Sequence, residues 1–251
     1  MISNIKEVLE IPRRKALRIS VGRPDHATNL ILKEIHRNGF YKAEKYWNED
    51  KIQVAKAAID ELCASTNVKN SWVDPEKSDH RFFFSEKHGK IFEEFQNDPF
   101  IEKVRKFYTG RERADKCVLA AKLISKSGNK GSGGGWHMDS PFSLQFKAFL
   151  FLTDVTDDNG PLEVILPTRN NLIKFCLEFS GLKKAGQYRF SDQEAERIQE
   201  KVGSAHTFIA KAGDLVLADV SALHRGKPIA AGVRYALTLY CGDPKITEKL
   251  A

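Results

Sequence analysis

Three residues far apart in the chain carry side chains that can bind one metal ion. His137 and Asp139 are separated by one residue in the stretch GGGWHMD (133–139), and His224 lies in the stretch LHRG (223–226). In an extended strand, residues i and i+2 point to the same face, so the imidazole and the carboxylate can approach one ion. Two histidines and one carboxylate that leave coordination positions open are typical of non-haem Fe(II) oxygenases. The spacing therefore predicts a metal site at His137, Asp139 and His224.

The His-x-Asp pair is a weak signal alone, because chance produces it in every few proteins of this composition. Further features support it. The glycine-rich run before His137 lets a ligand approach the backbone closely. His224 ends a strand-like run, DLVLADVSALH (214–224), as expected for a ligand at a barrel mouth. Arg234 follows on the next predicted strand, and a guanidinium binds a carboxylate through two parallel hydrogen bonds. Arg234 is thus a candidate anchor for a dicarboxylate co-substrate.

The first part of the chain is predicted to be mainly helical. Apolar spacing and capping residues predict helices over 25–38 and 49–64, and a helical stretch from about 90 to 109 that is interrupted at Asp98-Pro99. The intervening stretch SWVDPEKSDHRFFFSEKHG (71–89) is interpreted as a loop, and residues 1–24 as an irregular arm.

The second part is predicted to be β-rich. Short strands separated by turn residues are expected at 117–125, 144–155, 161–166, 206–210, 214–219 and 233–241. Asn159-Gly160 predicts a type I′ hairpin turn. A helical insertion is expected over 169–202, with a capping box at Ser191 and Glu194.

These patterns predict a mainly β fold with flanking helices and a double-stranded β-helix core of jelly-roll, cupin-like type. We expect one domain over 1–251, in which 1–115 is mainly helical and 116–245 forms the barrel around the insertion 169–202. Long excursions of this kind often act as lids. Lys183, Lys184 and Arg189 within it could meet a negative group, although a solvated helical face is the alternative.

Composition narrows the partners and the compartment. The chain has 40 basic and 33 acidic residues, a net charge of +7, but the charges are mixed along the sequence. This favours a basic surface, with a mild preference for anionic substrates, over nucleic-acid binding. There is no apolar run of the length that a membrane span needs and no secretory signal. The four cysteines form no CxxC pair, which favours reduced thiols and a cytoplasmic location.

Several segments, in order, resemble the phytanoyl-CoA dioxygenase family. FLFLTDVTDDNGPLEVILP (149–167) is similar to its central strand and hairpin, and KAGDLVLADVSALHRGKPIAAGVRYALTLY (211–240) to its distal-histidine and arginine segment. GGGWHMDSP supplies its His-x-Asp. The resemblance spans about residues 27 to 241. Two departures occur: LPTR (166–169) replaces the common Pro-Gly-Ser-His, and Gly226 replaces a hydroxyl residue after the distal histidine.

The resemblance implies a double-stranded β-helix oxygenase that uses Fe(II), 2-oxoglutarate and O2. His137, Asp139 and His224 would then be the iron ligands, and Arg234 would hold the distal carboxylate of 2-oxoglutarate. Phe149 is expected to line the co-substrate pocket or simply to pack in the core. Thr238, on the same strand face as Arg234, could assist the arginine, and Lys122 is a candidate for the inner carboxylate.

The preferred hypothesis is a hydroxylase that oxidises a C–H bond of a small-molecule, sugar-derived or carrier-linked substrate. Asp139 argues against the halogenating relatives, which need a small residue there so that chloride can bind iron. Two alternatives stay open: a non-catalytic ligand-binding barrel, and a cupin-like metal isomerase or hydrolase. The substrate and the oligomeric state are not identified by the sequence.

Overall fold

The computed structural model describes residues 21–139 and 146–242. The arm expected at 1–24 therefore lies almost wholly outside the described residues. The same is true of the first two positions of the strand expected at 144–155 and of the last three positions assigned to the barrel.

The predicted N-terminal helices are confirmed. Helix α2 (His26–Asn38) begins after Asp25, whose carboxylate accepts a hydrogen bond from the Thr28 amide at 2.8 Å, and ends at Gly39 with φ +86°. Only glycine adopts such a left-handed conformation at little cost. The remaining helices of this part are α3 (Glu49–Ala64), α4 (Lys90–Gln96) and α5 (Pro99–Thr109).

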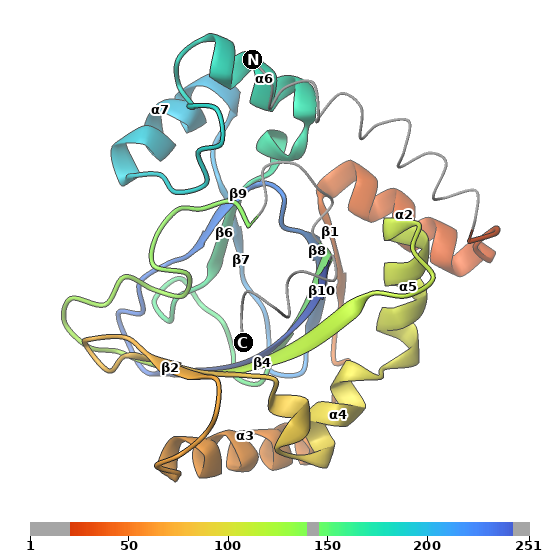
Figure 1. Ribbon diagram of the computed structural model, residues 1–251, viewed down its shortest axis with the longest axis vertical. Coiled ribbons are helices and arrows are strands. Elements are labelled where there is room, and N and C mark those ends of the chain that lie inside the picture. Colours follow the sequence, from red (N-terminus) through yellow and green to blue (C-terminus); the bar gives the residue numbers. More distant parts are fainter. Residues whose placement is uncertain (1–20, 140–145, 243–251) are drawn as a thin grey trace.

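Two antiparallel sheets form the core (Figure 1). The larger sheet has the strand order β1 (Phe40–Ala43), β8 (Leu215–Asp219), β5 (Phe146–Phe151), β10 (Val233–Gly242), β4 (Asp115–Ile124), β3 (Asp79–Phe83) and β2 (Ser71–Val73). The smaller sheet has the order β7 (His206–Phe208), β6 (Leu162–Ile165) and β9 (Leu223–Gly226). Both the mainly β class and the double-stranded β-helix core are confirmed.

Two local predictions are wrong. The stretch interpreted as a loop at 71–89 contains β2 and β3, which extend the larger sheet beyond β4. Asn159-Gly160 does not close a hairpin, because β5 and β6 belong to different sheets. Gly160 has φ +76°, whereas Asn159 keeps a negative φ. Its side chain instead bridges the Thr156 amide and the Asp154 carbonyl oxygen, at 2.7 and 2.6 Å.

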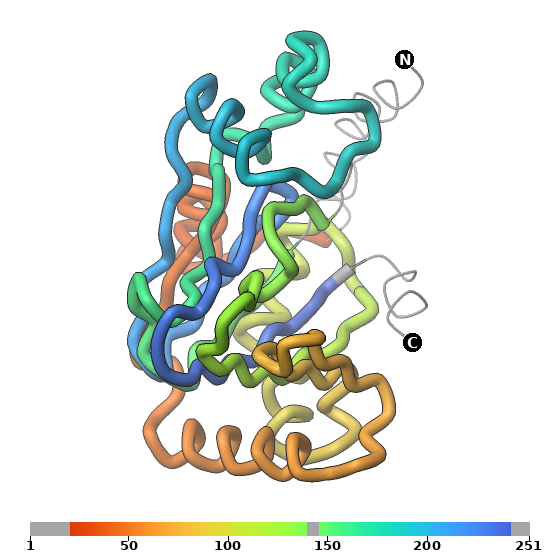
Figure 2. The backbone as a smooth tube through the Cα atoms, turned by 90° about the vertical axis from the view of Figure 1, so that its left-hand side faces the viewer, coloured from red at the N-terminus to blue at the C-terminus, as the bar shows by residue number. Residues whose placement is uncertain are grey.

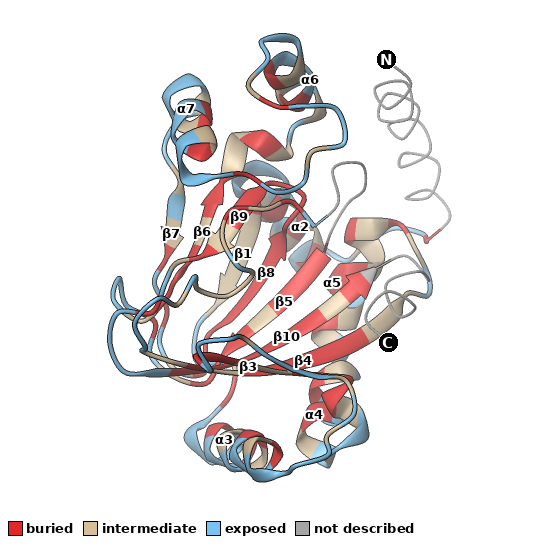
Figure 3. Ribbon diagram, turned by 60° about the vertical axis from the view of Figure 1, so that its left-hand side comes forward, coloured by how far each residue is buried: buried red, intermediate tan, exposed pale blue. Residues whose placement is uncertain are grey.

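The helices cover the outer face of the larger sheet. In strand β10, Tyr235, Leu237 and Leu239 point into the apolar core shared with α3, α4 and α5, and Figure 3 shows these buried strands beside the three helices. The alternate residues of β10 point to the interior of the barrel, because successive side chains of a strand lie on opposite faces. One face of the sheet therefore packs the core and the other forms the wall of a site.

The segment between β6 and β7 lies at the far end of the molecule from α3 (Figure 2). It contains the 3-10 turn η2 (Leu166–Arg169), α6 (Asn171–Phe179) and α7 (Asp192–Val202). The capping box of Ser191 and Glu194 is present, as predicted.

None of the helices in the described part of the chain combines the length and apolar character needed to cross a bilayer. The single-domain division of the chain remains a prediction.

The contact of α4 with the sheet supplies a test of the core. Phe92 is 0% exposed, whereas Phe179 on α6 is 88% exposed. We expect Phe92→Ala to lower the free energy of unfolding by about 3–5 kcal/mol, because it removes buried area and leaves a cavity. Phe179→Ala should change it by at most about 0.5 kcal/mol. Denaturant unfolding of both variants checks this, and equal effects would contradict the packing described.

Candidate metal centre and co-substrate pocket

The backbone joins the two predicted histidine ligands directly. The His137 amide donates to the His224 carbonyl oxygen at 2.8 Å, and the His224 amide donates back at 2.9 Å. On the other side of the same strand, the Met138 amide donates to the Tyr188 carbonyl oxygen at 2.8 Å. The Phe190 amide donates to the Trp136 carbonyl oxygen at 3.0 Å. The His-x-Asp strand is thus held between β9 and residues 188–190 of the segment between β6 and β7.

The three predicted metal-binding side chains converge. Ligand atoms of His137, Asp139 and His224 all lie within 4.8 Å of one another. The Nε2 atoms of His137 and His224 lie 3.7 and 3.8 Å from oxygens of Asp139. Each Nδ1 instead contacts a carbonyl oxygen two residues before it, Gly135 at 2.8 Å and Ala222 at 2.9 Å. These contacts assign the ring proton to Nδ1 and leave both Nε2 lone pairs free for a cation.

The surroundings favour the protonation states that a metal ion needs. Burial and the neighbouring His224 lower the pKa of His137 to about 3, and burial lowers the pKa of His224. Both imidazoles are therefore neutral at neutral pH. Burial opposes ionisation of Asp139, but the neighbouring ammonium group of Lys147 holds its pKa below the usual range. Neutral imidazoles and an ionised carboxylate form a donor set that fits Fe(II).

The glycines before the metal strand are required by close contacts. Gly133 has φ +91°, and a Cβ there would lie 2.3 Å from Cε1 of His137. A Cβ on Gly226 would lie 2.7 Å from the Cβ of Ser132, whose carbonyl oxygen accepts from the Gly226 amide at 2.9 Å. This close approach leaves no room for a side chain at position 226. The glycine-rich run therefore shapes the space beside the ligands.

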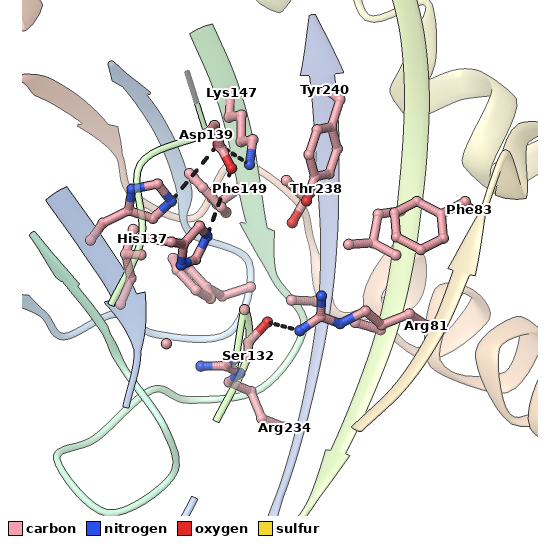
Figure 4. Close-up of a pocket in the computed structure, with 18 of the residues that line it drawn as sticks. Arg81, Phe83, Ser132, His137, Asp139, Lys147, Phe149, Arg234, Thr238 and Tyr240 are labelled. Atoms are coloured by element: carbon pink, nitrogen blue, oxygen red, sulfur yellow. Dashed lines mark hydrogen bonds and ion pairs between the residues drawn. The ribbon is translucent and has the colours of Figure 1, made fainter. Parts of the chain in front are cut away.

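A cavity of about 290 Å³ opens beside the three ligands (Figure 4). It lies against the inner face of the larger sheet. Its walls are formed by alternate residues of four neighbouring strands, and these are Arg81 and Phe83 of β3, Leu119 and Ala121 of β4, Lys147, Phe149 and Phe151 of β5, and Arg234, Ala236, Thr238 and Tyr240 of β10.

Arg234 lies in this wall with its charge unpaired. The residue is 6% exposed, and its Nε has no hydrogen-bond partner among the described residues. The Arg234 guanidinium also forms no ion pair with any described residue. Burial lowers its pKa to about 10, an effect that Asp79 opposes and Arg81 reinforces. A buried guanidinium without a carboxylate is costly, so this geometry fits a site for an anionic ligand.

The other predicted pocket residues divide into two groups. Phe149 and Thr238 both line the cavity, and they face each other across the β5–β10 pairing. Lys122 does not line it. The Lys122 Nζ donates to Asp60 on α3 at 2.6 Å and lies over the ring of Tyr235, on the outer face of the sheet. Because Lys122 is paired with Tyr235 in the β4–β10 register, it faces away from Arg234. We therefore withdraw Lys122 as a ligand for the inner carboxylate.

Sequence reasoning missed two cationic residues of the pocket, Lys147 and Arg81. Lys147 is two positions before Phe149, and its Nζ lies 2.5 Å from Asp139 Oδ2 and 4.0 Å from the ring centroid of Tyr240. Strand alternation from Phe149 could have found it. Arg81 was hidden because 71–89 was interpreted as a loop. Arg189 does reach the pocket, whereas Lys183, expected to face an anion, is buried in an ion pair with Glu178.

Comparison with known proteins agrees with this geometry. The sequence profile of the phytanoyl-CoA dioxygenase family matches residues 35–234. No curated protein sequence matches the chain. Solved structures share its fold at low identity. The epimerase SnoN from nogalamycin biosynthesis, in complex with Fe³⁺, alpha ketoglutarate and nogalamycin RO, has a TM-score of 0.62 at 14% identity, over 86% of this chain and 84% of its own.

Two further structures extend the comparison. The alpha ketoglutarate dependent carbocyclase SnoK, from nogalamycin biosynthesis, has a TM-score of 0.60 at 17% identity, over 88% of this chain and 87% of its own. HygX from Streptomyces hygroscopicus, with nickel, 2-oxoglutarate and hygromycin B bound, has a TM-score of 0.57 at 12% identity, over 86% and 87%.

A jelly-roll barrel with a His-Asp-His cluster at its mouth is the architecture of the iron- and 2-oxoglutarate-dependent oxygenases. The chain belongs to the phytanoyl-CoA dioxygenase family within that class. Its cofactor is accordingly iron and its co-substrate 2-oxoglutarate, and the cluster of His137, Asp139 and His224 fits the iron site.

The contact of Gly133 with His137 can be tested. We expect Gly133→Ala to weaken Fe(II) binding by about 10- to 100-fold, the usual effect of disturbing the support of a metal ligand. Gly181 lies away from the metal ligands and has φ +75°, but no atom of the described residues lies within 4 Å of a Cβ placed on it. Gly181→Ala therefore carries similar backbone strain without the clash, and should leave Fe(II) affinity nearly unchanged. Anaerobic calorimetric titration with Fe(II) distinguishes them, and equal losses would show that strain alone matters.

Proposed function

We propose that this protein is an Fe(II)- and 2-oxoglutarate-dependent dioxygenase that hydroxylates a C–H bond of a small-molecule or carrier-linked substrate. The observation that carries the proposal is the buried guanidinium of Arg234, which has no ion-pair partner among the described residues and lies in the cavity that the three ligand side chains also line. A metal site alone fits an isomerase or hydrolase equally well. A metal site beside a guanidinium that can bind a carboxylate favours 2-oxoglutarate as the co-substrate.

In this proposal each residue has a defined task. His137, Asp139 and His224 hold iron, which supplies oxygen activation coupled to decarboxylation of 2-oxoglutarate. Arg234 binds the distal carboxylate of 2-oxoglutarate, and Thr238, two residues along the same face of β10, adds a hydroxyl group. Phe149 packs beside the co-substrate and helps to exclude water.

Lys147 is assigned a positioning task. Its contact with Asp139 Oδ2 leaves Oδ1 on the side of His137. We infer that Lys147 holds one carboxylate oxygen so that Asp139 binds iron through the other, as outer partners of metal ligands commonly do. The segment 169–202 is proposed to cover the substrate, since residues 188–190 pair with the metal strand and Arg189 lines the cavity.

We propose hydroxylation, rather than another oxidation, as the outcome of the reaction. Structures that share this fold include proteins described as an epimerase and a carbocyclase, so the outcome must be read from the product. Incorporation of one atom of labelled O2 into the product would support hydroxylation. We also keep a cytoplasmic location, because all four cysteines are free and thiols persist in a reducing compartment.

The charge on Arg234 makes a sharp prediction. We expect Arg234→Met to weaken 2-oxoglutarate binding by about 100-fold or more, since each hydrogen bond to a charged group is worth about 1.5–3 kcal/mol. The same change should leave the free energy of unfolding equal or higher, because it removes an unpaired buried charge. Anaerobic titration with 2-oxoglutarate and denaturant unfolding measure the two effects.

Turnover provides the direct test of the reaction class. The iron-loaded protein should convert 2-oxoglutarate to succinate in an oxygen-dependent reaction, and His137→Ala should abolish it. The proposal would be refuted if Arg234→Met bound 2-oxoglutarate with normal affinity. It would also be refuted if iron-loaded wild-type protein formed no succinate at all, including by the uncoupled reaction that needs no primary substrate.

A further inference from the structure

A second guanidinium, that of Arg81, faces the same cavity from strand β3. Arg81 lies two strands away from Arg234 in the sheet, because β4 separates β3 from β10. Its Nε and Nη2 donate to Asp79 Oδ2 at 2.9 and 2.5 Å, and Nη2 also donates to Ser132 Oγ at 3.1 Å. Figure 4 shows Arg81 pointing toward Ser132, which belongs to the glycine-rich run before the metal strand.

The contacts of Arg81 hold it in place without using all of its donors. Its guanidinium carbon lies 5.0 Å from the ring centroid of Trp72, and its side chain is 15% exposed. Within the described ranges, Nη1 has no hydrogen-bond partner. The proton of the Ser132 hydroxyl is also free to donate, since its oxygen accepts from Arg81. The result is a preorganised pair of donors next to the metal-binding strand.

The charges around the cavity leave an excess of positive charge. Among the described side chains, Arg81, Arg234 and Lys147 line the cavity interior with positive charge and Asp139 lines it with negative charge. Asp79 does not line the cavity, but it is paired with Arg81. A divalent iron ion and a doubly charged 2-oxoglutarate cancel each other. One positive charge therefore remains after both have bound. Arg234 is then paired with the co-substrate, Lys147 with Asp139 and Arg81 with Asp79, so the excess belongs to the cavity as a whole.

A second cation lies at the mouth of the cavity. Arg189 is exposed, lines the opening, and donates to the Gly133 carbonyl oxygen at 2.5 Å. Gly133 is next to Ser132, so Arg81 and Arg189 both donate hydrogen bonds to the same glycine-rich run. Positive side chains at the opening and inside the cavity favour the capture of a negatively charged substrate group.

We propose that Arg81 and Ser132 form an anion-recognition subsite for the primary substrate, which therefore carries a carboxylate or phosphate group. The inference rests on the proposed function above and names the substrate class of the same site. Arg81 donates through Nη1 and Ser132 through its hydroxyl to the anionic group. This would place the rest of the substrate in the cavity that His137 also lines. Arg81 is thus a specificity residue, separate from the co-substrate anchor Arg234.

Matched small molecules test the subsite without knowledge of the natural substrate. Phenylacetate and phenyl phosphate supply the two anionic groups, and phenylacetamide is the neutral counterpart of the first. Each is titrated calorimetrically into protein loaded with Fe(II) and saturating 2-oxoglutarate under anaerobic conditions, so that the co-substrate already occupies Arg234. We expect at least one anion to bind tenfold or more tightly than the amide.

Variants assign that preference to Arg81. Arg81→Gln leaves Asp79 buried without its partner, so the double variant D79N/R81Q, in which a neutral pair replaces the ion pair, is measured beside it. Both should weaken anion binding by about 10- to 100-fold, as expected for a charge-assisted hydrogen bond. Ser132→Ala should weaken it by a smaller factor. Arg113 is exposed in the loop before β4, and Arg113→Gln is the control that should change nothing.

The outcomes separate this inference from the proposed function. Wild-type protein that binds 2-oxoglutarate but no anion, or binds anion and amide equally, overturns the subsite and leaves the proposed function intact. An R81Q variant with unchanged anion binding also overturns it. Weakened 2-oxoglutarate binding in R81Q would assign Arg81 to the co-substrate and refute the subsite. Wild-type protein that binds no 2-oxoglutarate refutes both.

Discussion

The candidate site depends on the two backbone hydrogen bonds that join His137 to His224. Each residue belongs to a different part of the barrel wall, and 86 positions separate them in the chain. The reciprocal bonds at 2.8 and 2.9 Å set the relative position of their Cα atoms. The contact of each Nδ1 with a carbonyl oxygen of its own strand then sets the direction of the ring. Main-chain pairing therefore sets the positions from which the two imidazoles extend.

Because side chains alternate along each strand, one face of the larger sheet packs against the helices and the other lines the cavity. In β10 the residues Tyr235, Leu237 and Leu239 pack against the helices, while Arg234 and Thr238 face the cavity. The helical layer therefore supplies the apolar burial that stabilises the fold. The inner face is left free to carry charged groups that a folded core does not tolerate without partners.

Much of the site could be predicted from the sequence because its signals are local. One residue lies between His137 and Asp139, and Arg234 and Thr238 share a face of one strand. The error at Lys122 arose because β4 is apolar on both faces, so alternation within Val118–Leu123 does not reveal which side is inward. Only the pairing of Lys122 with Tyr235 decides it. Such register is a long-range property that the local pattern does not contain.

Arg81 and the hairpin prediction illustrate the same limit. Three consecutive phenylalanines, Phe82–Phe84, conceal the alternation that places Arg81 and Phe83 on the inner face. Asn159-Gly160 has the composition of a tight turn, yet it connects two different sheets. In both cases the neighbouring strand, rather than the segment itself, determines the outcome.

The pairing of residues 188–190 with 136–138 has a consequence for how relatives of this protein can diverge. The segment between β6 and β7 contributes a strand-like edge to the wall that carries His137. It cannot be exchanged as an independent module, because a graft that lacks this edge would leave amide and carbonyl groups of the metal strand without partners. Changes in this segment are therefore constrained by the hydrogen bonds that position His137.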